Sequence, residues 1–218
     1  FFLTGMDEHG QKIFEKAKSE NMDVRDFVTK YAEAFKILDQ KLEVNFDRFI
    51  RTTDSDHYKV CKQLWMKMLD NGDLYEKEYV GLYCVGCEGF KTEKDLTPDG
   101  LCPDHLKAPI QLKEKNWFFK LSNYENFLKG KIESGELKIT PENRKNEMLE
   151  FIGNGLQDIS FSRSKELMSW GIPVPNDDTQ VMYVWADALT NYITGAKVFS
   201  DESYFKEYWT DGETLHVI

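Results

Sequence analysis

Apolar residues recur every three or four positions along two stretches of the chain, and this spacing predicts two amphipathic helices. The first helix begins after Asp23, and the second runs from about Asp54 to Asp70, with Gly72 as its C-terminal stop. Both stripes are expected to be core: Val24, Phe27, Val28, Tyr31, Phe35, Leu38 and Leu42 in the first, and Tyr58, Cys61, Leu64, Trp65 and Met68 in the second. Cys61 is therefore expected to be a packing thiol rather than a nucleophile.

Two shorter apolar runs are each followed by a polar turn or a helical pattern. Phe1-Phe2-Leu3 predicts a buried strand that leads into Asp7, Glu8 and His9, and the run 181–185 predicts a strand that leads into a helix over 186–193. The carboxyl ends of strands line the ligand crevice of open α/β sheets, so the acidic turn is placed where a site would be. The alternative is that Asp7 or Glu8 only caps the helix that follows.

The stretch between these junctions predicts a separate subdomain. Residues 79–83 and 116–121 are rich in β-forming residues and predict two short strands. Thr140-Pro141 predicts a helix that begins with a capping hydroxyl and runs to about Asn154; Met148, Ile152 and Leu156 are expected to point inward. A last strand is expected at 215–218.

A metal site is predicted between the two short strands. Cys84 and Cys87 are separated by two residues, and so are Cys102 and His105, which is a spacing typical of tetrahedral Zn²⁺ sites. Four protein ligands leave no open coordination position, so a structural rather than a catalytic zinc is expected. Disulfide pairing of these cysteines is the competing interpretation.

Composition narrows the classes of function. The chain has 218 residues, 41% of them hydrophobic, and a formal net charge of −10, so its overall field does not draw it to nucleic acid or to anionic lipid. No apolar run is long enough to span a bilayer and no secretory signal is present, so a cytoplasmic protein without a membrane partner is expected. Because the chain begins at Phe1 in the middle of a strand pattern, we expect an internal piece of a longer polypeptide.

Several stretches, in the same order, resemble the catalytic region of methionyl-tRNA synthetases, and they cover nearly the whole chain. They are Phe2-Leu-Thr-Gly-Met-Asp-Glu-His-Gly10, Phe49-Ile-Arg-Thr-Thr-Asp54, Cys84-Val-Gly-Cys-Glu88 with Cys102-Pro-Asp-His105, Phe118-Phe119, Ile159-Ser-Phe-Ser-Arg163, Trp170-Gly-Ile-Pro-Val-Pro175 and Tyr183-Val-Trp-Ala-Asp-Ala-Leu-Thr-Asn-Tyr-Ile193.

The resemblance implies an α/β fold with a Rossmann-like doubly wound parallel sheet, split by a zinc-binding connective insertion. Residues 1–73 and 181–218 would form two parts of the catalytic nucleotide-binding domain, and residues 74–180 the insertion, with its zinc knuckle at 84–105. Such enzymes use ATP with Mg²⁺ to activate L-methionine as the adenylate and then transfer it to tRNA(Met).

The resemblance also implies roles for single residues. Asp7 would accept the α-ammonium group of methionine, and the methionine pocket would be lined by Trp185, Ala188, Leu189 and Tyr192. Arg163 would assist catalysis as a fixed cation near phosphate or carboxyl groups. For Trp185 and Tyr192 the alternative role is ordinary core packing.

The chain departs from the family pattern at three positions and lacks two motifs. Met6 replaces a small hydroxyl residue, Ala186 replaces a bulkier apolar residue, and His105 stands where many members have a fourth cysteine. The two ATP-handling motifs of the class, of the His-Ile-Gly-His and Lys-Met-Ser-Lys-Ser types, do not occur, so residues 1–218 alone are expected to be inactive. Two alternatives stay open: a class I synthetase for another amino acid, and a non-catalytic zinc-containing module that binds RNA.

Overall fold

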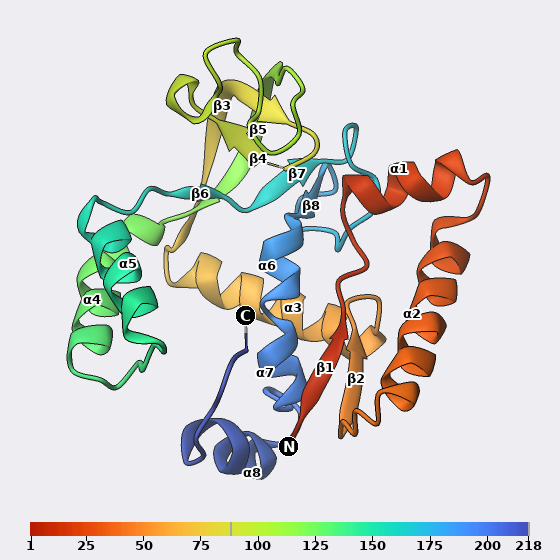
Figure 1. Ribbon diagram of the computed structural model, residues 1–218, viewed down its shortest axis with the longest axis vertical. Helices are drawn as coiled ribbons and strands as arrows, with labels where there is room; N and C mark the ends of the chain where they lie inside the picture. The colour runs from red at the N-terminus through yellow and green to blue at the C-terminus, as the bar shows by residue number, and fades with distance from the viewer. Residues whose placement is uncertain (88, 218) are drawn as a thin grey trace.

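The computed structural model describes residues 1–87 and 89–217, with the backbone only at residues 79 and 114 (Figure 1). The sequence predictions for Glu88 and Ile218 lie outside the described residues. The elements in chain order are β1 (Leu3–Met6), α1 (Gln11–Ser19), α2 (Val24–Lys41), β2 (Arg48–Arg51), α3 (Ser55–Asp70), β3 (Leu74–Cys84), β4 (Gly89–Lys91), η1 (Glu93–Asp95), β5 (Ile110–Phe119), η2 (Leu121–Tyr124), α4 (Glu125–Glu133), α5 (Glu142–Gly153), β6 (Ile159–Ser160), β7 (Ser162–Ser164), β8 (Gln180–Met182), α6 (Val184–Ala188), α7 (Asn191–Gly195), α8 (Glu202–Phe205) and η3 (Lys206–Thr210).

Strands β1 and β2 form a parallel pair that is connected through α1 and α2. Gly5 faces Ile50 across the pair, and a Cβ at Gly5 would lie 1.9 Å from the Ile50 carbonyl oxygen, so a side chain there would push the strands apart. The predicted buried strand at Phe1-Phe2-Leu3 is wrong in its position. Phe1 and Phe2 are half exposed because β1 begins only at Leu3, where its pairing with β2 begins.

Helix α2 buries only part of its apolar stripe. Asp23 caps the helix by accepting hydrogen bonds from the amides of Arg25 and Asp26, and the first turns bury Phe27 and Val28 against α1. The expectation that the whole stripe is core is wrong for the residues that follow. They are exposed because α2 has 18 residues and its partner α1 only nine: Tyr31, Phe35, Leu38 and Leu42.

Helix α3 lies at the centre of the largest described core. Its buried Trp65 and Cys61 pack with Leu74, Ile172 and Met182, so the helix contacts the start of β3 and the end of β8. The predicted helix over 54–70 and the buried thiol are confirmed.

The middle of the chain forms a four-stranded antiparallel sheet in the order β4-β3-β5-β6. Strands β3 and β5 pair from Leu74 opposite Phe119 to Tyr83 opposite Ile110, so both strands are longer than their apolar runs predicted. Beside this sheet, α4 and α5 pack as a helical pair around Ile132, Ile152 and Leu156 (Figure 1).

Two details of α5 differ from the prediction. Pro141 occupies the N-cap, and no side chain hydrogen-bonds there, so the Thr140 hydroxyl does not cap the helix. Met148 is 42% exposed because α4 covers only the face of α5 that carries Ile152.

The expected second strand-to-helix junction is shorter than predicted. Strand β8 ends at Met182 and pairs antiparallel with β7, and the chain turns into α6 at Val184, so Trp185 is helical rather than extended. Among the described strands, β1 and β2 alone pair in parallel. The described residues 215–217 form no strand, and Leu215 and Val217 are more than four-fifths exposed.

Candidate functional site

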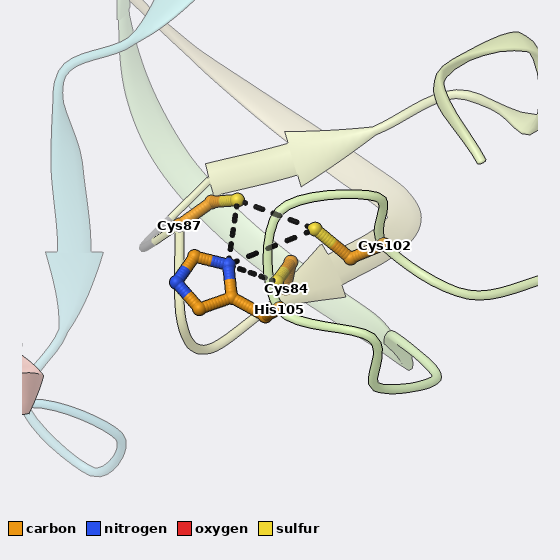
Figure 2. Close-up of side chains that lie close together, drawn as sticks. All are labelled: Cys84, Cys87, Cys102 and His105. Carbon is orange, nitrogen blue, oxygen red and sulfur yellow. Dashed lines mark hydrogen bonds between the residues drawn. The ribbon is translucent and has the colours of Figure 1, made fainter. Parts of the chain in front are cut away.

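The four predicted metal ligands converge at the end of the long hairpin. Cys84 is the last residue of β3, Cys87 lies in the turn after it, and Cys102 and His105 come from the loop before β5. Their ligand atoms all lie within 4.8 Å of one another. Figure 2 shows the three sulfurs around one nitrogen of the imidazole, Nδ1.

The spacing of these atoms fits a tetrahedral ion. Zn–S bonds of 2.3 Å at tetrahedral angles place two sulfurs about 3.8 Å apart, and an Sγ–N pair slightly closer. The Sγ atoms of Cys87 and Cys102 are 3.5 Å apart, and Nδ1 of His105 lies 3.3 Å from Cys87 and 3.9 Å from Cys84. All the cysteines are free, so the disulfide alternative is wrong.

Gly86 is part of this geometry because it lets the His105 ring approach the turn. A Cβ at Gly86 would lie 2.4 Å from Cδ2 of His105, far inside van der Waals contact.

The thiols of the cluster differ in acidity. Desolvation and hydrogen bonds to the other thiols raise the pKa of Cys87 to about 12, whereas for Cys102 hydrogen bonds led by His105 outweigh desolvation and lower the pKa to about 6. The thiolate is the form of cysteine that binds a metal ion, so a bound cation would favour deprotonation of these side chains.

A second candidate site lies at the carboxyl end of β1. Asp7 is exposed, and Nδ2 of Asn191, in α7, lies 3.4 Å from its Oδ1. Desolvation by the surrounding protein raises the pKa of the Asp7 carboxyl, and the charge of His9 partly opposes this effect. The structure thus places the predicted ammonium-binding carboxylate against the helix that carries Tyr192.

The other predicted pocket residues divide into two groups. Trp185, Leu189 and Tyr192 expose 54%, 54% and 38% of their surface, so they form an apolar surface along α6 and α7 rather than core. Ala188 is only 6% exposed and lies beneath this surface. Ordinary core packing is therefore wrong as the role of Trp185 and Tyr192.

Arg163 is held far more tightly than a freely accessible catalytic cation. It is 4% exposed, and its Nη1 donates to the Ser162 carbonyl at 2.8 Å and to the Ser160 hydroxyl at 2.9 Å. Its guanidinium carbon lies 4.1 Å from the centroid of Tyr183 and 5.7 Å from that of Tyr83. Arg163 thereby links the residue before Cys84 to the residue before α6.

A buried polar network behind Asp7 was only partly visible in the sequence. The turn placed His9 near a site, but nothing in the sequence indicated its partner Asp187, which lies 2.9 Å away and is fully buried. Burial raises the pKa of Asp187, and the hydrogen bond from His9 opposes the rise. Glu8, also fully buried, pairs with Arg51 at 2.6 Å. Paired carboxylates of this kind fix the turn between β1 and α1.

Comparison with known proteins identifies the family of the chain. The profile of the tRNA synthetases class I (M) matches residues 1–111 and 105–218. The chain belongs to this family. It is similar to the methionine–tRNA ligase of Fusobacterium nucleatum, with 41% identity over 217 residues. It is also similar to that of Rickettsia conorii, with 41% identity over 218 residues.

These matches cover all of this chain but only 34% and 42% of the two relatives, so it spans about a third of the first and about two fifths of the second. Among solved structures, it is similar to the Mycobacterium tuberculosis methionyl-tRNA synthetase bound by methionyl-adenylate, with a TM-score of 0.87 and 39% identity. That match covers 95% of this chain and 41% of the other. The mixed α/β fold expected from the sequence is confirmed.

In the part of the chain that the structure describes, no helix has both the length and the apolar composition needed to cross a bilayer. A surface depression of about 570 Å³ lies away from Asp7, between the hairpin and the β7–β8 turn. Charged side chains such as Glu76, Lys115 and Asp177 line it, so it is unsuited to an apolar amino acid.

Proposed function

We propose that this chain is part of a methionine–tRNA ligase, which activates L-methionine with ATP and transfers it to tRNA(Met). The observation that carries the proposal is the position of the Asp7 carboxylate beside α7. Helices α6 and α7 expose aromatic and aliphatic side chains, among them Trp185 and Leu189. A free amino acid with an apolar side chain needs both features: an anion for its ammonium group and an apolar surface for its side chain.

The chemistry of methionine suits the exposed surface on α6 and α7. A thioether is apolar and polarisable, and sulfur is attracted to aromatic rings while making almost no hydrogen bonds. We propose that Trp185, Leu189 and Tyr192 contact the methionine side chain and that buried Ala188 supports them from beneath. Selection among amino acids then depends mainly on shape.

We infer further that β1 and β2 belong to a Rossmann-like nucleotide-binding sheet that the insertion interrupts. In this division, residues 1–73 and 181–218 form parts of the catalytic domain, and residues 74–180 form the connective insertion. A boundary about twenty residues before 73 stays open as the alternative, because α3 shares its core with Met182 of β8 and also with Leu74 and Ile172 of the insertion.

Zinc is the proposed ion for Cys84, Cys87, Cys102 and His105, because three thiolates and one imidazole suit a tetrahedral d¹⁰ ion. When bound, it would cross-link the two loops at the tip of the hairpin. ATP with Mg²⁺ would be a substrate rather than a resident cofactor, and a cytoplasmic location completes the proposal.

The buried position of Arg163 favours a positioning role for this residue near the site. Its contacts with Tyr83 and Tyr183 connect the metal-binding hairpin to the start of α6. We propose that Arg163 contributes to catalysis by fixing α6, and thus Trp185, relative to the insertion.

Thermal unfolding in the presence of single amino acids tests the proposed function. A ligand at one hundred times its Kd stabilises the native state by about 2.7 kcal/mol. In the enzyme that contains this chain, at the length of its relatives, methionine should raise the melting temperature and leucine, valine and cysteine should not. A rise with another amino acid would indicate a class I synthetase of different specificity. No rise with any of them, together with binding of RNA, would favour the non-catalytic RNA-binding module.

A further inference from the structure

The turn after β1 and helix α6 are far apart in the sequence and are joined by a buried polar contact. Nδ1 of His9 lies 2.9 Å from Oδ2 of Asp187, although 178 positions separate the two residues. His9 is 3% exposed and Asp187 is fully buried. Figure 1 shows α6 and α7 running beside β1 with α3 behind them. Gly195 of α7 packs so closely on Leu3 of β1 that a Cβ there would lie 2.6 Å from it.

The contact is the main polar support of the Asp187 carboxylate. Its second oxygen, Oδ1, has no hydrogen-bond partner among the described residues, so the buried carboxylate relies on His9 for compensation. His9 itself is fixed on two further sides. Its Nε2 lies 2.9 Å from the Tyr58 hydroxyl of α3, and its ring centroid lies 5.1 Å from that of Trp170. These contacts hold the imidazole in a fixed orientation, and Asp187 of α6 is hydrogen-bonded to it.

Each partner in this contact is two residues from a residue of the proposed methionine site. Asp7 precedes His9 on the same turn, and Trp185 precedes Asp187 on α6. The direct contact between the two halves of the site is weak, because Asn191 reaches Asp7 at only 3.4 Å. The buried pair, together with the packing of Gly195 on Leu3, thus holds the turn that carries Asp7 against the helices that carry the aromatic surface.

We propose that His9 and Asp187 are positioning residues for the amino acid substrate, holding α6 at the distance from β1 that lets one methionine reach both Asp7 and Trp185. This inference rests on the proposed function and adds two residues that hold the parts of the methionine site in place. A displacement of about 1 Å in a reacting group can lower the rate about a hundredfold. A buried hydrogen bond that fixes α6 can therefore change the rate of methionine activation without contacting methionine.

The competing role for the pair is general stabilisation of the fold. The two roles differ in what they predict for the two substrates of the activation step. If the pair has a positioning role, its loss raises KM for methionine and leaves KM for ATP unchanged. If its loss only reduces the amount of folded protein, the rate of the activation step falls and neither KM changes.

Two pairs of variants in the enzyme that contains this chain separate the roles. An asparagine amide places a donor and an acceptor near Nδ1 of the original imidazole, and a glutamine amide places them near Nε2. His9→Asn therefore keeps the contact to Asp187 and loses the one to Tyr58, while His9→Gln does the reverse. Asp187→Asn keeps an acceptor for His9, and Asp187→Ala removes it.

The matched control is Tyr75→Phe, which removes a hydrogen bond of 2.8 Å to Asp158 within the insertion, away from the proposed site. The measurements are KM for methionine and for ATP in ATP–pyrophosphate exchange, Kd for methionine by calorimetry, and the melting temperature. We expect His9→Gln and Asp187→Ala to raise KM and Kd for methionine about tenfold or more, with KM for ATP unchanged. The conservative variants should restore most of this loss, and Tyr75→Phe should change only the melting temperature.

Equal methionine affinities for His9→Gln and His9→Asn, or a parallel change in KM for ATP, would overturn the proposal. If His9→Gln does not fold, the Asp187 pair decides by the same comparison. If neither severe variant folds, Asp187→Asn and His9→Asn are compared with the parent enzyme, and a Kd for methionine more than about twofold weaker in both would overturn the proposal. Failure of the parent enzyme to bind methionine at all would instead refute the proposed function.

Discussion

Replacement of Gly86 by alanine tests the metal site through its tightest contact. The new Cβ would stand 2.4 Å from Cδ2 and 2.5 Å from Cγ of His105, whereas ordinary contacts begin at 3.4 Å. The ring must retreat by about 1 Å, but metal–ligand distances tolerate changes of only about 0.2 Å. His105 can then no longer share an ion with the three thiolates in the present geometry.

The size of the effect follows from the number of ligands. Structural zinc contributes about 10–16 kcal/mol, which corresponds to about 3 kcal/mol for each of four ligands. Loss of His105 should therefore weaken zinc binding by about a hundredfold. The backbone of the hairpin is otherwise unaffected, because β3 and β5 pair along ten positions that exclude Gly86.

Competition with a chromophoric chelator measures the zinc affinity of the enzyme that contains this chain. Gly89→Ala is the matched control, because a Cβ at Gly89 meets nothing closer than the Cys87 carbonyl oxygen at 3.7 Å. The control should bind zinc as the parent does, and the Gly86 variant about a hundredfold more weakly. Equal affinities for the two variants would refute the assignment of His105 as a ligand.

Three other predictions test separate parts of the account. Trp185→Ala should weaken methionine binding about tenfold in calorimetry while the melting temperature hardly changes, because the side chain is 54% exposed; an unchanged Kd would remove Trp185 from the site. Residues 1–218 alone should give no methionine-dependent ATP–pyrophosphate exchange, and exchange at the rate of the longer enzyme would contradict this. Burial lowers the pKa of His57 from 6.5 to about 4, so the unfolded chain takes up a proton there that the folded chain refuses, and about 3 kcal/mol of stability should be lost as pH falls through this range. Urea titrations of the parent and of His57→Gln should therefore diverge between these pH values, and parallel curves would contradict the assignment.

The sequence was most informative where the relevant contacts are local. The pairs Cys84–Cys87 and Cys102–His105 each lie within one turn, so their spacing alone predicted the cluster that the structure shows. The helix with the apolar stripe around Trp65 was likewise predicted correctly, because its periodicity is a property of one segment.

The sequence was least informative where tertiary partners decide. The run ending at Trp185 is rich in β formers, but β8 stops at Met182, opposite the first residue of its antiparallel partner β7, and the chain then turns into α6. The exposed half of α2 carries the same apolar spacing as its buried half, and only the length of α1 distinguishes them. The contact of His9 with Asp187 spans 178 positions, and no local pattern announces it.

Asp7 is proposed to bind the ammonium group of methionine, and a ligand that lacks this group tests that role most directly. Calorimetry would compare methionine with its desamino analogue in the parent enzyme and in Asp7→Asn. A charge-assisted hydrogen bond contributes about 1.5–3 kcal/mol, so the parent should prefer methionine by at least about tenfold. The variant should bind both ligands about equally weakly. If Asp7→Asn keeps the full preference for methionine, the ammonium group is bound elsewhere and the account of the site is wrong.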